Sequence, residues 1–119
     1  MDDVIYIEDE ETAGLIFKIG LSTQNINVLH IPDTEPQSLE LLKTPEYQAA
    51  KAIFFDLWIG GASGVDLAAS LREAGDTRPF FLLTAGENPN VNRLKEINLI
   101  YLRKPVVDFK KLADMIRSL

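Results

Sequence analysis

Five short apolar runs, separated by stretches with helical spacing, are the feature of this sequence that most limits its fold. The runs cover residues 4–7, 27–31, 52–55, 80–83 and 99–102. Three of them are apolar without alternation, as expected for strands that are covered on both faces of a parallel sheet. The run at 27–31 contains Asn27 and His30 and is more polar, so we predict that it lies nearer an edge.

The helix-like stretches between these runs complete the pattern. They cover residues 11–21, an ambiguous region at 37–51, residues 64–74, residues 91–97 and a last helix that Asp108 can cap. In the first, Leu15 and Ile19 are four residues apart, and in the second Thr44 and Pro45 can start a new helix. This alternation of apolar runs and helix-like stretches predicts an α/β fold with a parallel sheet. Crossovers between parallel strands are nearly always right-handed, which favours a doubly wound arrangement. We expect a doubly wound, five-stranded parallel sheet flanked by helices, of the flavodoxin-like type.

Size and charge narrow the classes of protein. A chain of 119 residues fits one domain, which we expect to span residues 1–119. The net charge of −6 and the scattered Lys and Arg residues argue against direct binding of nucleic acid. The absence of Cys excludes disulfides and thiolate chemistry. No apolar run approaches the roughly 20 residues that span a bilayer, and no leader pattern follows Met1, so we expect a cytoplasmic protein without membrane contact.

Polar residues follow the predicted strands at the points where the strands end. Glu8 and Asp9 follow the first, Asp56 the third, Thr84 the fourth and Lys104 the fifth. In doubly wound sheets the functional site gathers outside the carboxyl ends of the strands, so these side chains should share one crevice. Clustered carboxylates raise one another's pKa unless a cation compensates, and both Lys104 and a Mg²⁺ ion suit that role. An Asp beside such charges is a reasonable nucleophile toward a phosphoryl group.

Most of these residues also have a plain structural interpretation, which is harder to apply to Asp56 because an acid at the end of a buried strand needs a partner. Asp9 could cap the first helix, Lys104 could be only a counter-ion, and Thr84 could be an ordinary strand-end residue. Tyr101, a lone aromatic residue in a strand, could be part of the core. We interpret His30 as structural and expect it to lie far from the acidic rim.

Short motifs in chain order carry a resemblance to a family. They are the acidic pair Glu8-Asp9, the stretch Phe54-Phe55-Asp56-Leu57-Trp58-Ile59 with Gly64 eight residues after Asp56, the pair Thr84-Ala85, and Tyr101-Leu102-Arg103-Lys104-Pro105. Over essentially the whole chain this order resembles the receiver domain of two-component response regulators, the CheY-like family.

The resemblance implies a phosphorylation switch with Mg²⁺ as cofactor. Asp56 would accept a phosphoryl group from a phosphohistidine on a sensor histidine kinase or a histidine phosphotransfer protein. Asp9, Asp56 and the backbone carbonyl of Trp58 would ligate Mg²⁺, and Glu8 would help through a water molecule.

The resemblance also implies a readout. Thr84 and Lys104 would bind phosphoryl oxygens, and movement of Thr84 would let Tyr101 turn inward. That movement would shift the face made by the fourth helix, the fifth strand and the fifth helix. Trp58 and Gly86 would tune the lifetime of the phosphoryl group.

The chain departs from the family pattern at two places that we can name. Gly60 stands where the family usually has Pro, and Ile97-Asn98 stands where a Gly-Ala pair is usual. The bond between Lys104 and Pro105 is expected to be cis, as in the family.

Other functions stay open at the level of sequence. A pseudo-receiver would keep the fold, ignore phosphorylation and act as a protein-interaction module. A phosphatase of the haloacid dehalogenase type would need a second Asp two residues after the nucleophile, where Trp58 stands. We therefore expect no enzyme beyond self-phosphorylation and slow autodephosphorylation. The sequence does not indicate the downstream target, and it leaves a weak homodimer open.

Overall fold

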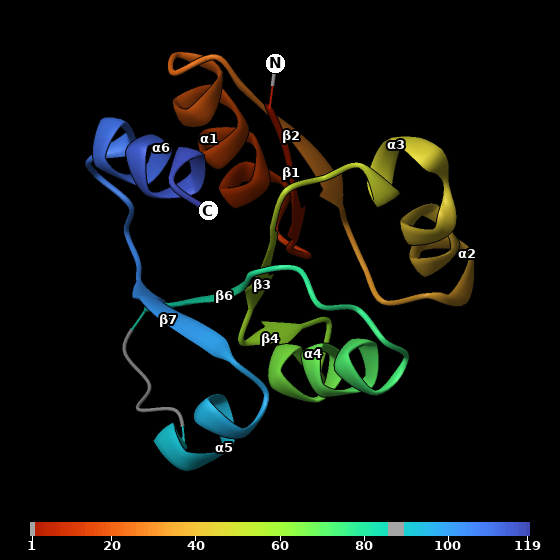
Figure 1. The fold of residues 1–119 in the computed structure, drawn as a ribbon. Helices are drawn as coiled ribbons and strands as arrows, with labels where there is room; N and C mark the ends of the chain where they lie inside the picture. Colours follow the sequence, from red (N-terminus) through yellow and green to blue (C-terminus); the bar gives the residue numbers. More distant parts are fainter. Residues whose placement is uncertain (1, 86–89) are drawn as a thin grey trace.

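The computed structural model of the chain describes residues 2–85 and 90–119. Its centre is a parallel sheet of five strands in the order β2-β1-β3-β6-β7 (Figure 1). The strands are β1 (Asp2–Ile7), β2 (Ile26–Ile31), β3 (Ile53–Asp56), β6 (Phe80–Thr84) and β7 (Leu99–Arg103). All five predicted runs are strands, and the more polar run is the edge strand β2, so the predicted fold class is confirmed.

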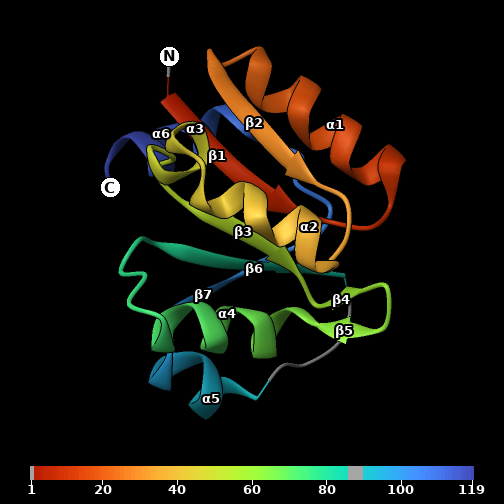
Figure 2. The same cartoon turned by 90° about the vertical axis from the view of Figure 1, so that its right-hand side faces the viewer.

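Helices cover both faces of the sheet (Figures 1 and 2). On one face lie α1 (Glu11–Ser22) and α6 (Phe109–Arg117). On the other lie α2 (Pro36–Leu39), the 3₁₀ helix η1 (Glu40–Lys43), α3 (Pro45–Gln48), α4 (Gly64–Glu73) and α5 (Val91–Glu96). Of the helices that the described residues form, none is long and apolar enough to cross a membrane.

Two apolar cores result, one on each side of the sheet. Successive strand residues point to opposite faces, so Ile53 and Phe55 of β3 join one core and Phe54 joins the other. In the second core the rings of Phe54 and Phe81 stack with centroids 4.6 Å apart. The middle of the sheet is therefore apolar on both faces, and polar side chains are left to the strand ends.

Helix ends follow the sequence in part. The ambiguous region at 37–51 forms three short helices, and Pro45 takes the first turn of α3 as predicted. Asp108 caps α6, because its Oδ1 accepts from the amide of Lys111 at 2.9 Å. At α1 the N-cap is Glu10, whose side chain makes no capping bond within the described residues.

The buried face of α1 differs from the one that the spacing of Leu15 and Ile19 indicates. Both side chains are more than half exposed, and the helix buries Phe17 and Leu21 instead. Glycines explain the difference: a Cβ at Gly20 would overlap the ring of Phe109 of α6. Small residues let backbone and rings approach closely, so the glycine-bearing face of α1 turns toward its neighbours.

A small antiparallel hairpin after β3 is absent from the sequence prediction. Its strands are β4 (Trp58–Ile59) and β5 (Ala62–Ser63), joined by Gly60 and Gly61. Both glycines have positive φ, +57° and +88°, as type I′ turns require. Figure 2 shows the hairpin between β3 and the start of α4. It stands directly after Asp56, at the carboxyl ends of the strands.

Candidate functional site

Lys104 joins the two central carboxylates at the carboxyl end of the sheet. Its Nζ donates to Oε2 of Glu8 at 2.8 Å and to Oδ1 of Asp56 at 3.1 Å. Lys104 follows β7, Glu8 follows β1 and Asp56 ends β3, so three strands meet here. The peptide bond between Lys104 and Pro105 is cis, which confirms that expectation.

Glu8 is the most buried acid of the site. Its side chain is 2% exposed, and Oε2 also accepts from the hydroxyl of Tyr6 at 2.8 Å. Oε1 accepts from the amide of Glu10 at 3.1 Å. Tyr6 lies in β1 and Glu8 directly follows that strand, two residues further along the chain, where the hydroxyl reaches the carboxylate. Burial, followed by the charge of Glu8, raises the pKa of Tyr6, so Tyr6 is a fixed donor.

His30 lies against the same loop. Its Nε2 is 2.7 Å from the carbonyl oxygen of Glu8, and its ring fills the space where Gly14 has no Cβ. The prediction that His30 lies far from the acidic rim is wrong, because β2 pairs with β1 and places His30 opposite Tyr6. The ring of His30 also lies near that of Tyr6, with centroids 6.3 Å apart. These contacts to a backbone carbonyl and to packed neighbours support the structural interpretation of this residue.

Asp9 sits at the mouth of the site. It is exposed, and its Oδ2 accepts from the amide of Gly60 at 2.8 Å. That bond is the largest cause of the lowered pKa of Asp9. One carboxylate oxygen from each of Glu8, Asp9 and Asp56 lies within 4.8 Å of the others. Such a set of oxygen donors fits a hard divalent cation such as Mg²⁺.

The charge at this crevice is unbalanced. Burial raises the pKa of Asp56 and the charge of Glu8 raises it further, while the bond to Lys104 offsets only part of this. Burial would lower the pKa of Lys104, but Glu8 and Asp56 raise it overall, so the ammonium stays charged. Three carboxylates thus cluster beside one ammonium, which pairs with two of them, and a second source of positive charge would complete the site.

Gly64 holds the backbone of Asp56 in place. Its amide donates to the carbonyl of Leu57 at 2.8 Å, and a Cβ at this position would overlap the carbonyl oxygen of Asp56. The sequence left Gly64 without an assigned contact. The structure shows that α4 starts against the end of β3 and that only glycine fits there.

The remaining predicted residues that the structure describes differ in their exposure. Thr84 is 5% exposed at the end of β6, and its carbonyl accepts from the amide of Lys104 at 3.0 Å. Tyr101 is 38% exposed on β7, so it is not plain core. Trp58 is 51% exposed in the hairpin. Gly86 lies outside the described residues.

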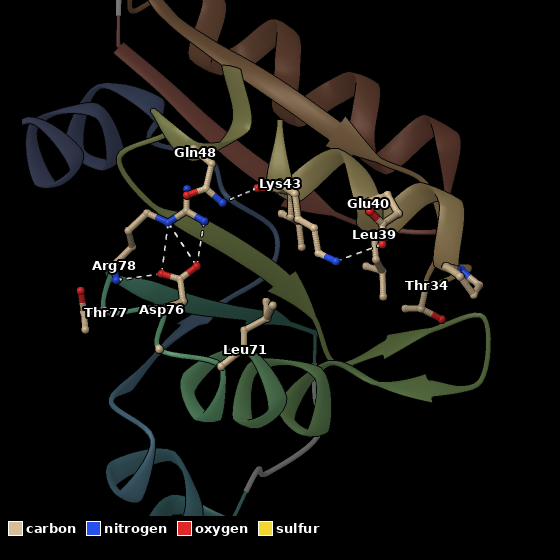
Figure 3. Close-up of a pocket in the computed structure, with 13 residues that line it drawn as sticks. Thr34, Leu39, Glu40, Lys43, Gln48, Leu71, Asp76, Thr77 and Arg78 are labelled. Atoms are coloured by element: carbon tan, nitrogen blue, oxygen red, sulfur yellow. Dashed lines mark hydrogen bonds and ion pairs between the residues drawn. The ribbon is translucent and has the colours of Figure 1, made fainter. Parts of the chain in front are cut away.

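A sizeable groove lies elsewhere on the molecule. A groove of about 770 Å³ opens between α2, η1 and the end of α4 (Figure 3). Its polar groups already bind one another: Lys43 pairs with Glu40 at 3.1 Å, and Arg78 pairs with Asp76 at 2.8 Å. None of the predicted acceptor-site residues that the structure describes lines it, so the strand-end crevice stays the better candidate.

Comparison with solved structures supplies the fold family. The chain superposes on a response regulator receiver domain protein from Clostridium thermocellum with a TM-score of 0.83. The two are 21% identical over 99% of this chain and 93% of that chain. The chain has the receiver-domain fold. A CheY-like receiver domain from Methylobacillus flagellatus gives a TM-score of 0.80 at 22% identity over 99% and 98% of the two chains.

A chemotaxis protein, CheY4 of Vibrio cholerae, is similar over 100% of this chain and 99% of that one, with 18% identity and a TM-score of 0.80. Neither a family model nor a curated protein matches the sequence, so the likeness rests on three-dimensional structure. The fold is that of a response-regulator signalling domain, and the predicted resemblance is confirmed at this level.

The two departures from the usual receiver pattern have backbone causes. Gly60 has φ +57°, which Pro cannot adopt, because the chain forms the hairpin turn here. Asn98 has φ +52° before β7, a left-handed conformation that Asn tolerates better than most residues. Both substitutions therefore keep the chain turning where the fold needs it.

Proposed function

We propose that this chain is a phospho-accepting signalling switch of a two-component system or phosphorelay, with Asp56 as the acceptor. The observation that carries the proposal is the position of Lys104, shared between Asp56 at 3.1 Å and Glu8 at 2.8 Å at the carboxyl end of the sheet. The side chain of Asp56 is 19% exposed, so a donor can reach it. The phosphoryl donor would be a phosphohistidine on a sensor kinase or a phosphotransfer protein.

The chemistry is one displacement at phosphorus. An oxygen of Asp56 forms the new O–P bond while the P–N bond to the donor imidazole breaks, and the bonding electrons leave with the imidazole nitrogen. Lys104 neutralises charge on the transferred oxygens, as electrostatic positioning does in phosphoryl transfer. Asp9, Asp56, the carbonyl of Trp58 and, through water, Glu8 would hold Mg²⁺. The ion would supply further neutralisation of the phosphoryl charge.

Before phosphorylation, Glu8 and Asp56 both bind the ammonium group of Lys104. The carboxylate of Glu8 binds the ammonium at 2.8 Å, closer than Asp56 does. Lys104 can therefore move from the carboxylates to a phosphoryl oxygen without losing a partner of opposite charge. We propose that it changes partners in this way when Asp56 is modified.

The readout that we propose runs through Thr84 and Tyr101. After transfer the hydroxyl of Thr84 would bind a phosphoryl oxygen, and Tyr101 would turn from its exposed position toward the space that Thr84 leaves. The face made by α5, β7 and α6 would then present a different surface to a downstream protein. Trp58 and Gly86 would adjust how readily water reaches the phosphoryl group.

The test is an intact-mass measurement. The protein is incubated with a small phosphodonor with and without Mg²⁺, beside Asp56→Asn and the control Asp114→Asn, which alters an exposed acid of α6. The proposal expects one phosphoryl group that is Mg²⁺-dependent, labile to hydroxylamine and absent only from Asp56→Asn. No adduct on any of the three proteins would instead favour the phosphorylation-independent interaction module.

A further inference from the structure

The hairpin after β3 contacts the proposed acceptor site through a bond from Gly60 to Asp9. From this bond we infer that Gly60 is a positioning residue, whose backbone amide holds Asp9 in the orientation that binds the metal ion. The inference rests on the proposed function, since it concerns the same Mg²⁺ site. It adds a residue that neither composition nor strand-end spacing indicates.

The bond connects two loops that are far apart in sequence. The amide of Gly60 donates to Oδ2 of Asp9 at 2.8 Å, across 51 residues. Asp9 is exposed on the loop between β1 and α1, so its carboxylate would otherwise sample several rotamers. A donor fixed to the neighbouring loop restricts that freedom. Groups that orient metal ligands from outside typically change metal affinity about 10- to 100-fold when they are lost.

The hairpin can act as a fixed support because both of its strands are anchored. Ile59 is 1% exposed and packs into the core on the α4 side of the sheet. Ser63 pairs with Trp58, and its Oγ accepts from the amide of Asp66 at 3.2 Å, capping α4. The turn between these anchors therefore has little room to drift away from Asp9.

The turn needs the backbone that glycine provides. Gly60 has φ +57°, and a Cβ there would meet nothing within 4 Å. The constraint at this position is thus the conformation and the N–H group, not the space for a side chain. Asn adopts this conformation readily in two-residue hairpins and keeps the amide, whereas Pro can do neither.

These facts define a matched pair of variants, Gly60→Asn and Gly60→Pro. The measurement is isothermal titration calorimetry with Mg²⁺ alone, supported by thermal unfolding of each variant. We expect Gly60→Asn to bind Mg²⁺ like the unaltered protein and Gly60→Pro to bind it about 10-fold or more weakly. Equal affinity in all three proteins would overturn the inference. If the unaltered protein does not bind Mg²⁺, the proposed function itself fails, which is a distinguishable result.

A second measurement covers the case in which Gly60→Pro does not fold. Amide hydrogen exchange of Gly60, followed by NMR without metal, compares the unaltered protein with Asp9→Ala. The inference expects exchange at Gly60 to be several-fold slower when Asp9 is present, because the carboxylate holds the amide. The same exchange rate in both proteins would show that Asp9 and Gly60 do not bind each other, and would overturn it.

Discussion

Charged side chains cluster at both ends of the sheet, but the two clusters are built differently. We call the end that carries Asp56, the proposed acceptor, the acceptor end. At the opposite end, Arg72 donates to four backbone carbonyls, of residues 76, 78, 97 and 98, and its guanidinium lies 3.7 Å from the centre of the Phe80 ring. Arg78 donates hydrogen bonds to both carboxylate oxygens of Asp76 and to the backbone carbonyls of Tyr47 and Ala50.

The acceptor end has the reverse balance, with three clustered carboxylates, of which two pair with Lys104. The pKa shifts of Asp76 and Asp56 have opposite directions and reflect this difference. Burial would raise the pKa of Asp76, but its bonds to Arg78 lower it overall, whereas the pKa of Asp56 is raised. A cluster in which donors and acceptors match stabilises the fold. A cluster with excess charge of one sign is a candidate for binding an ion of the other sign.

The largest expected effect on stability is at Gly64, at the acceptor end, and Gly75 at the opposite end serves as its comparison. In Gly64→Ala the new methyl group would overlap the carbonyl of Asp56, and we expect a loss of about 3 kcal/mol or more in the free energy of unfolding. Gly75, with φ +98° and open space around it, should cost only about 1 kcal/mol as Gly75→Ala. Urea denaturation of both variants checks this. Equal losses would mean that Gly64 is not held against the acceptor strand.

An intermediate effect is expected at the matched cluster. Asp76→Asn removes charge-assisted bonds from Arg78 and should cost about 1.5–3 kcal/mol at pH 7. The pKa of Asp76 in the folded protein lies below its ordinary value of 3.8. The contribution of the Asp76 carboxylate to stability is therefore present above pH 3.8 and is lost as the pH falls through the folded pKa. Denaturation between pH 2 and pH 7 measures it. The exposed Asp114→Asn should change stability by less than about 1 kcal/mol, and a similar loss there would contradict the comparison.

The smallest effect has the opposite sign. Because the folded pKa of Asp56 lies above 3.8, its contribution to stability is present below pH 3.8 and is lost as the pH rises through the folded pKa. Asp56→Asn should therefore be more stable than the unaltered protein at pH 7 without metal, by up to about 1 kcal/mol. Mg²⁺ should narrow the gap by stabilising only the unaltered protein. A destabilised Asp56→Asn in metal-free buffer would show that the acceptor end carries no excess charge.

The sequence predicted the strands and the strand-end residues because both follow from local patterns. Apolar runs without alternation indicate buried parallel strands, and topology then places Asp56, Thr84 and Lys104 at one rim. The burial of Glu8 was not predicted, because it depends on the ion pairs that Lys104 makes with both Glu8 and Asp56 in the folded protein. The contact between Tyr6 and Glu8 could have been predicted from their spacing, because residues two apart in extended chain point to the same face.

The contacts that sequence reasoning missed are those between loops. The pair Gly60-Gly61 is a signal for a two-residue hairpin turn, yet nothing local shows that its amide meets Asp9. The exposure of Leu15 and Ile19 on α1 could not be predicted either, because it depends on contacts with distant parts of the chain. Helical spacing identifies an apolar stripe, while the closest approach of α1 is set by Gly14 and Gly20 against rings from elsewhere in the chain.

The central claim is that Asp56 receives the phosphoryl group, and mapping the modified residue tests it most directly. After incubation with a small phosphodonor and Mg²⁺, the protein is reduced with borohydride, which converts an aspartyl phosphate to homoserine, and is then digested for peptide mass spectrometry. The account predicts homoserine at position 56 and unmodified Asp9 and Glu8. Homoserine at another acid, or none at any position in a protein that binds Mg²⁺, would contradict it.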